Sequence, residues 1–199
     1  SLTSFIGPKP NLLGIDETNP PMRLEVHQPV LSQDDMDSLL NLEKSTKGRY
    51  KSQVLDITHP LKQVSAGCDA AITALCDAAV KAVGKGYNVL ILSDRAVSAT
   101  RVAIPALLAC AAVHHHLVRV GLRTSTGLVV DTGSVREVHH FALLAGYGAE
   151  AVCPWLAFDT IANMGDMLPA GLEAKDAKKR FVKGINKGLL KVMSKMGIS

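Results

Sequence analysis

The stretch that decides the fold runs from Asn88 to Phe158. It contains three short apolar runs, which are Asn88-Val-Leu-Ile-Leu-Ser93, Leu128-Val-Val-Asp131 and Ala149-Glu-Ala-Val-Cys153. Each run is followed by a longer segment whose composition favours a helix. A nearly continuous apolar run of this length is typical of a strand that is covered on both faces. The alternation therefore predicts an α/β fold with a mainly parallel sheet.

A fourth βα unit precedes these three in the sequence. A short strand is expected at 53–58, followed by an Ala-rich helix at 66–83 that Gly84-Lys-Gly86 ends. The later helices are expected at 100–120, with Pro105 near the start, at 134–145 and at 155–164. Four repeated βα units make either a partial (β/α) barrel or a small open sheet, and the pattern leaves both alternatives open.

The first 30 residues differ from this region because prolines recur too closely for a helix. Gly7-Pro-Lys-Pro10, Asn19-Pro-Pro21 and Gln28-Pro29 predict an extended segment that lies on the rest of the chain. Ser32 then has the character of an N-cap, with Asp34 and Asp35 in the first turn of a helix that runs to about residue 42, before a polar loop at 43–49. We expect an extended segment at 1–30, an α/β domain at 31–172 and a helical tail at 173–199.

The tail is strongly basic. It carries eight Lys or Arg residues against two acids, whereas the remainder of the chain is close to neutral. Its composition predicts helical stretches at 174–183 and 184–196, with lysines every fourth residue on one face and apolar residues on the other. Such a helix can bind a membrane surface or a peptide-binding groove. We favour an ordinary helix whose apolar face meets a part of a longer protein.

Bulk properties narrow the class of protein. With 47% hydrophobic residues and a mean hydropathy of +0.18, the 199-residue chain can bury a large core. It has no apolar run of about 18 residues and no signal-peptide pattern, so no membrane partner is expected. The near-neutral body does not favour nucleic-acid binding. The start without Met and the abrupt end suggest a piece of a longer protein.

The four cysteines, Cys68, Cys76, Cys110 and Cys153, form no C-x-x-C pair. We expect free buried thiols in a reducing compartment and no metal or iron–sulfur site in this chain. Neighbouring residues on a helix point about 100° apart, so the three histidines at 114–116 cannot bind one ion together. We expect these histidines to pack between helices. Glycine-rich nucleotide loops and a Gly-x-Ser-x-Gly nucleophile motif are absent from the sequence.

Polar residues follow each expected strand, at the edge where parallel α/β folds bind ligands. Asp94 and Arg95 could bind a carboxylate or form an interdomain ion pair, and Asp131 could cap the helix expected from 134. Alternatively, all of them merely cap helices and satisfy loop backbone. The residues with expected interdomain or structural roles at strand ends are His59, Asp94, Arg95, Asp131, Arg136 and Glu137.

Several blocks, in order, resemble one known family. They are Ser4-Phe-Ile-Gly-Pro-Lys-Pro-Asn-Leu-Leu13, Gln28-Pro-Val-Leu-Ser32, the block from Leu90 to Trp155, and Lys187-Gly-Leu-Leu-Lys-Val-Met-Ser-Lys-Met-Gly-Ile-Ser199. Together they resemble the central region of the large subunit of glutamate synthase, and the last block is similar to the entrance of its synthase domain. The resemblance covers essentially the whole chain.

The resemblance implies a role inside a multidomain enzyme. In that family an amidotransferase domain releases ammonia from glutamine, and the ammonia passes through an internal tunnel. An FMN-carrying (β/α) barrel combines it with 2-oxoglutarate, and a 3Fe–4S iron–sulfur cluster relays electrons from NADPH, NADH or ferredoxin. The central domain links the amidotransferase and FMN synthase domains, lines part of the ammonia route, and is itself non-catalytic. The implied location is the cytoplasm or, in a eukaryote, the plastid stroma.

The resemblance also implies where the neighbouring site begins. Met196, Gly197 and Ser199 stand where the flavin and 2-oxoglutarate site of the family starts, and no bound cofactor is expected in this chain itself. A different class of protein remains as the alternative. The chain could be a stand-alone α/β enzyme or a small-ligand-binding domain that uses Asp94, Arg95 and Asp131.

Overall fold

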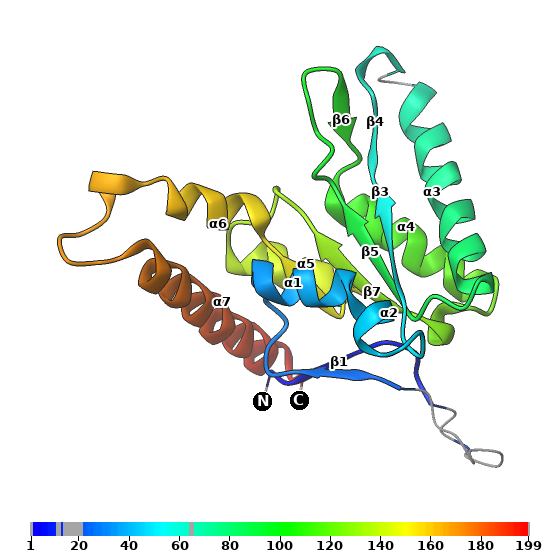
Figure 1. Cartoon of the computed structure of the whole chain (residues 1–199), viewed down its shortest axis with the longest axis horizontal. Helices are drawn as coiled ribbons and strands as arrows, with labels where there is room; N and C mark the ends of the chain where they lie inside the picture. Colours follow the sequence, from blue (N-terminus) through cyan, green and yellow to red (C-terminus); the bar gives the residue numbers. More distant parts are fainter. Residues whose placement is uncertain (1, 11–12, 14–21, 64–65, 199) are drawn as a thin grey trace.

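The computed structural model describes residues 2–10, 13, 22–63 and 66–198. Its central sheet has four parallel strands, β3 (Ser52–Asp56), β5 (Val89–Ser93), β7 (Gly127–Asp131) and β8 (Ala151–Cys153). The strands lie side by side in the order in which the chain visits them (Figure 1). This order is that of a (β/α) barrel, whereas a doubly wound sheet reverses its order at a switch point. The predicted α/β fold is confirmed, and its winding is that of a partial barrel.

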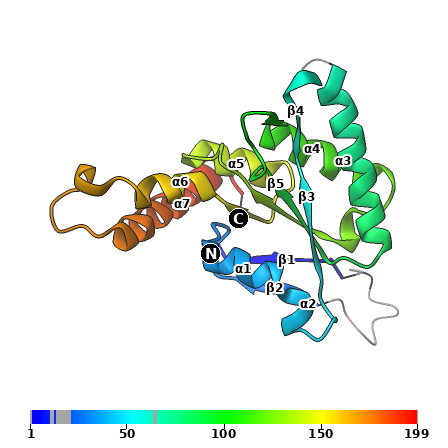
Figure 2. The ribbon, with the colours of Figure 1, turned by 45° about the horizontal axis from the view of Figure 1, so that its top comes forward.

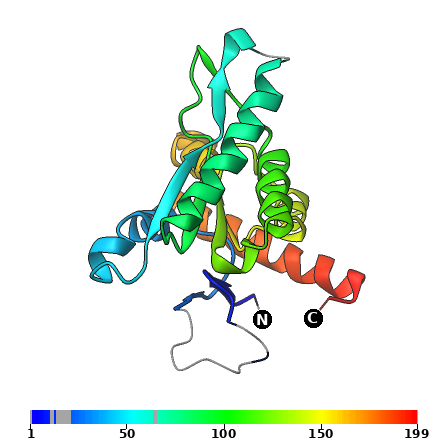
Figure 3. The ribbon, with the colours of Figure 1, turned by 90° about the vertical axis from the view of Figure 1, so that its right-hand side faces the viewer.

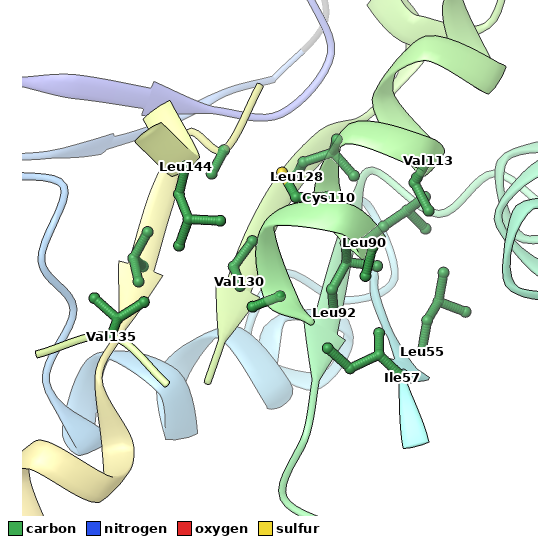
Figure 4. Close-up of a cluster of buried hydrophobic side chains, with 14 of the residues drawn as sticks. Leu55, Ile57, Leu90, Leu92, Cys110, Val113, Leu128, Val130, Val135 and Leu144 are labelled. Carbon is green, nitrogen blue, oxygen red and sulfur yellow. The ribbon is translucent and has the colours of Figure 1, made fainter. Parts of the chain in front are cut away.

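Helices α3 (Ala66–Gly84), α4 (Ala106–Arg119) and α5 (Val138–Gly146) cover one face of the sheet. The alternate strand residues that point to this face meet apolar side chains of the helices in one continuous core (Figure 4). The core side chains labelled in Figure 4 include Leu55, Leu90, Leu92, Leu128 and Val130 from the strands, Cys110 and Val113 from α4, and Leu144 from α5.

The other face is covered by what we call the N-terminal layer. It consists of the antiparallel pair β1 (Ser4–Ile6) and β2 (Leu24–Val26) and of helices α1 (Gln33–Leu40) and α2 (Leu42–Ser45). Figure 2 shows this layer on the side of the sheet away from α3 and α4. The remaining strand side chains pack against it in a second apolar cluster, formed by Ile6, Leu31, Met36, Leu39, Leu42, Tyr50, Val89, Ile91, Val129, Ala151 and Cys153.

The entry into α1 has the geometry that the sequence predicts. The Ser32 hydroxyl accepts a hydrogen bond from the Asp35 N–H at 3.2 Å, and the Ser32 N–H donates to the Asp35 carboxylate at 2.7 Å. This is a capping box. Just before it, the Val152 N–H donates to the Pro29 carbonyl at 2.7 Å and the Leu31 N–H donates to the Val152 carbonyl at 2.9 Å. Residues 29–31 therefore cover the outer edge of β8.

The prediction of a helix at 100–120 is wrong for its first residues. Residues 101–103 form strand β6 (Arg101–Ala103), which pairs antiparallel with β4 (Thr58–Pro60) in a hairpin-like arm beyond the carboxyl ends of the main strands (Figures 1 and 3). Pro105 is the N-cap of α4, and the residue before a proline avoids helical geometry. The Arg101 guanidinium reinforces the pair, because it donates to both the hydroxyl and the carbonyl of Thr58 at 2.8 Å.

The tail also differs from the prediction. It is one continuous helix, α7 (Ala174–Met196), which packs on α5 and on α6 (Trp155–Ala162). Ile185 and Leu189 are buried in the main core, so these apolar residues find their partners inside the chain. A side chain at Gly188 would collide with Val138, and the missing Cβ lets α7 approach α5 closely. The partner outside the chain that the sequence analysis favoured is not required for this part of the face.

Three short 3₁₀ turns, at Leu61–Gln63, Arg123–Ser125 and Gly165–Met167, complete the secondary structure, and α2 occupies part of the loop predicted at 43–49. Within the parts of the chain that the structure describes, the helices are all too short or too polar to cross a membrane.

The packing of α7 can be tested with two adjacent leucines. Leu189 is 7% exposed and Leu190 is 45% exposed. Leu189→Ala should lower the free energy of unfolding by about 2–5 kcal/mol because it leaves a cavity in the core. Leu190→Ala, the matched control, should cost less than about 1 kcal/mol. Urea unfolding measures both, and equal small losses would mean that α7 is not part of the core.

Candidate functional site at the carboxyl ends of the strands

Polar side chains meet at the carboxyl ends of β5, β7 and β8, where parallel α/β folds place their ligand sites. The parallel register aligns Ser93 with Asp131 and Asp131 with Cys153, so that residues far apart in the sequence become neighbours. We call this group the strand-end cluster. Its members are Ser93, Asp94, Arg95, Asp131, Thr132, Cys153 and Trp155.

Asp131 and Arg95 form the central ion pair of the cluster. Asp131 is 3% exposed and accepts hydrogen bonds from Arg95 Nε at 2.7 Å and Arg95 Nη2 at 3.0 Å, and from the Ser93 hydroxyl at 2.9 Å. Burial opposes the charge on Arg95, but the two-point contact with Asp131 outweighs it and raises the pKa of the guanidinium. Arg95 also donates to Gln33 of α1 at 2.7 Å and lies over the Trp155 ring at 5.4 Å. One side chain thereby connects the sheet, α1 and α6.

Asp94 is the second buried carboxylate, with 5% of its surface exposed. It accepts hydrogen bonds from the Thr132 hydroxyl at 2.5 Å, from the Gly133 N–H at 3.0 Å and from Trp155 Nε1 at 2.6 Å. Both of its oxygens are therefore occupied by donors of the protein. A carboxylate held in this way orders the loop after β7 and fixes the orientation of the indole.

The remaining residues predicted at strand ends lie outside this cluster. His59 is 6% exposed in β4, and its Nδ1 has no hydrogen-bond partner among the described residues. Arg136 and Glu137 are exposed; the Arg136 N–H donates to His140 Nδ1, and the Glu137 carboxylate is 3.4 Å from His140 Nε2. Asp131 does not cap a helix, because α5 begins only at Val138 and Asp131 is engaged by Arg95.

The three residues named for the flavin and oxoacid site fall at the end of α7. Met196 is 68% exposed, Gly197 ends the helix in the left-handed conformation with φ +69°, and Ser199 lies outside the described residues. Figures 1 and 3 show both chain ends below the sheet, whereas the strand arrowheads point upward. Met196 and Gly197 line none of the larger cavities. They lie at the far end of α7 from the strand-end cluster, and their place at the start of a flavin and oxoacid site stays a prediction.

The cysteines do not fit an iron–sulfur cluster. They are distributed over α3, α4 and β8, and the described residues contain no group of three side chains that could bind a metal together. Burial raises the pKa of the Cys110 thiol to about 11 and that of Cys153 to about 12.

Two cavities adjoin the strand-end cluster. One, of about 750 Å³, lies between α1, α6 and α7, and it has four lysines of α7 on one side and three aspartates on the other. It includes Trp155 but neither buried carboxylate. The second, of about 330 Å³, is an open groove beside β3 that Arg95 and Asp131 border. The charged lining of the larger of these two cavities therefore comes from helix side chains rather than from the strand ends.

A second buried polar group, at the opposite ends of the strands, escaped the sequence analysis. Arg123 is 8% exposed and donates to His114 Nδ1 at 3.0 Å, to two backbone carbonyls, and to Glu150 at 3.5 Å. Glu150 in turn accepts the N–H of Gly7 at 3.0 Å. Burial raises the pKa of Glu150, against the opposing effects of Gly7 and Arg123. We call this the amino-end cluster, and it attaches the N-terminal layer to the sheet.

The role of Asp94 can be tested with Asp94→Asn. An amide nitrogen cannot accept a hydrogen bond, so at least one buried donor would lose its partner at a cost of about 1–3 kcal/mol. Trp155 is the single tryptophan, and its emission should shift to longer wavelength as the indole loosens. Asp159→Asn on α6 is the control and should change neither quantity. An unchanged spectrum and stability in Asp94→Asn would contradict the assigned role.

The amino-end cluster predicts a specific pH dependence. Burial, and then the charge of Arg123, lowers the pKa of His114. The unfolded chain therefore binds this proton more readily, and stability falls as the pH drops below the ordinary histidine value of about 6.5. His114→Gln should flatten the loss of stability between pH 7 and pH 5. His115→Gln, at the exposed neighbour, should keep the wild-type slope, and parallel slopes for all three proteins in urea unfolding would refute the assignment.

Comparison with known proteins gives one consistent family. The family described as "Glutamate synthase central domain" matches residues 1–199. Among curated relatives, the NADH glutamate synthase of Schizosaccharomyces pombe is 41% identical and the NADPH glutamate synthase large chain of Bacillus subtilis is 37% identical. The ferredoxin-dependent chloroplastic enzyme of Oryza sativa subsp. japonica is 39% identical. Each match covers all of this chain but only 9–13% of the relative.

A solved structure supports the barrel-like winding. A flavocytochrome b2 variant with benzoylformate matches with a TM-score of 0.56 and 14% identity. The match covers 80% of this chain and 35% of that one, and the neighbour is a TIM-barrel-like flavoenzyme. At this identity the likeness concerns the fold alone.

Proposed function

Because the chain belongs to the glutamate synthase central domain family, we propose that it is an internal domain of a glutamate synthase large chain. The parent reaction converts glutamine, 2-oxoglutarate and two reducing equivalents into two molecules of glutamate. The domain links the amidotransferase domain to the FMN synthase domain, lines part of the ammonia route between them, and performs no chemical step. We place the parent enzyme in the cytoplasm or the plastid stroma.

The occupied strand-end cluster is the observation that carries this proposal. Both buried carboxylates, Asp94 and Asp131, have their oxygens hydrogen-bonded to donors of the protein. A general base needs a free lone pair within reach of a substrate proton, and a binding site needs unpaired donors. Here the two carboxylates, together with Arg95, connect β5, β7, α1 and α6. Such an arrangement suits a rigid spacer, which keeps two distant active sites at a fixed separation.

The same geometry weakens the alternative of a stand-alone enzyme. Arg95 would have to leave Asp131 to bind a substrate carboxylate, and Asp131 would then be a buried charge without its partner. We assign most of the FMN site and the iron–sulfur cluster to other domains of the parent, which agrees with the described residues holding no group of three side chains that could bind a metal together. The relatives are named for three electron donors, NADH, NADPH and ferredoxin, and all share this region. We infer that the domain does not select the donor.

The proposal predicts that Arg95→Ala in the full-length synthase uncouples its two half-reactions. Without the guanidinium, α1 and α6 lose their common tie to the sheet, and the spacer loosens. Glutamine hydrolysis should persist, while the glutamate formed per glutamine hydrolysed should fall several-fold. Paired assays of ammonia release and glutamate formation measure the ratio.

Arg180→Ala, at an exposed arginine of α7, is the control and should keep the wild-type ratio. An unchanged ratio of glutamate formed to glutamine hydrolysed in Arg95→Ala would contradict the spacer role. If synthesis from 2-oxoglutarate and free ammonia were lost while the coupling of the remaining turnover stayed intact, Arg95 would have a direct part in the chemistry.

A further inference from the structure

The two outer strands of the sheet differ in how their free edges are protected. Residues 29–31 bond to the outer edge of β8. β3 pairs only with β5, and within the described part of the chain no strand lies on its other side. Natural proteins cover, charge or interrupt such edges because an unpaired strand readily binds another. The protection of β3 therefore has to come from elsewhere.

The pairing of β3 with β5 shows which backbone N–H and C=O groups of β3 are not bonded to β5. The Val89 N–H donates to the Lys51 carbonyl at 3.1 Å, and the Ile57 N–H donates to the Ser93 carbonyl at 3.0 Å. In a parallel ladder with this register, residues 51, 53, 55 and 57 face β5. Residues 52, 54 and 56 turn their N–H and C=O groups outward. Of these, the Val54 carbonyl accepts a hydrogen bond from the Gln53 side chain at 2.9 Å. This bond is exposed, so a backbone N–H of an added strand could replace the Gln53 amide as the donor.

An apolar groove runs beside this edge on the side of the N-terminal layer. It has a volume of about 330 Å³, and Met36, Leu40, Val54 and Ile91 contribute its apolar lining. Val54 is 40% exposed and Leu40 is 50% exposed, which is high for large apolar residues beside a buried core. A strand added to β3 would point every second side chain over this groove. The edge and the groove together form a site for an extended segment.

The usual obstacles to strand addition are absent from β3. Its sequence, Ser52-Gln-Val-Leu-Asp56, contains no proline and no lysine. The single charge, on Asp56, is already engaged, because its carboxylate accepts the Thr58 N–H at 2.8 Å and lies 3.2 Å from Arg101. The strand is five residues long, which is enough for two or three new backbone hydrogen bonds on its outer side.

We infer that the outer edge of β3 binds an extended, largely apolar segment of the same longer polypeptide, which adds a fifth strand to the sheet. The inference rests on the proposed function, since an internal domain has the rest of its chain in cis. The relatives supply the scale, because the matched region is only 9–13% of their length. Backbone hydrogen bonds would provide the affinity and the groove would select an apolar side chain.

Hydrogen exchange at single-residue resolution in the full-length synthase tests this inference, with an internal control in the same strand. The inward amides of Gln53 and Leu55 should be protected in any case. The outward amides of Val54 and Asp56 should be protected as well, on the order of 100-fold or more relative to an unstructured peptide. Outward amides that exchange freely beside protected inward ones would overturn the inference. Protection that disappears when the enzyme is diluted would assign the edge to a second copy and would also overturn it.

A pair of substitutions separates docking from folding. Val54→Pro removes only an outward N–H, and a proline at such a position is compatible with an edge strand. In the full-length enzyme it should abolish the protection of the Asp56 amide and keep that of Leu55. Val54→Thr, which retains the N–H and the branched shape, should keep both. Loss of Leu55 protection in the proline variant would show misfolding, in which case the exchange pattern of the unsubstituted enzyme decides. The Arg95 coupling assay is independent of these readouts, so the two proposals can fail separately.

Discussion

The structure depends on the burial of β5 and β7 on both faces. All five residues of each strand are buried, so the sheet requires a covering layer on either side. Helices α3, α4 and α5 form one layer, and the N-terminal layer, which comes from the start of the chain, forms the other. Burying these apolar side chains is the main favourable contribution to folding. The positions of these helices and of the N-terminal layer follow from that requirement.

Among the described residues, the buried charged side chains Asp94, Asp131 and Arg123 lie where the strands end, and each has partners there. At one end Asp94 and Asp131 bind Arg95, Trp155 and the loop after β7, and at the other Arg123 binds Glu150 and His114. A buried charge without a partner is costly, whereas a satisfied network rigidifies what it connects. The strand-end cluster lies where parallel α/β folds place active sites, but its carboxylates are hydrogen-bonded to other groups of the protein, as in a structural contact.

The sequence predicts the parts of the fold that depend on local patterns. The apolar runs at β5 and β7 give the parallel sheet, Ser32 gives the start of α1, and the residues that follow each strand give the strand-end cluster. It does not predict what depends on distant pairing. β6 has too few residues to show alternation, and only its pairing with β4 makes it a strand. The amino-end cluster escaped because Gly7 and Glu150 meet only after the chain has folded, and the continuity of α7 escaped because two glycines interrupt its composition.

The attachment of the N-terminal layer has a consequence for the order of folding. Neighbouring strands of the sheet follow one another in the chain, so the βα units make contacts of short sequence separation. The bond from Gly7 to Glu150 spans 143 residues, and the bond from Tyr50 to the Ile6 carbonyl spans 44. Closing such long loops costs entropy before any contact compensates for it, so these contacts belong to the late steps. The βα layer can form as each unit is synthesised, with one apolar face of its sheet still uncovered. The N-terminal layer precedes these units in the sequence but is the last to pack against the sheet.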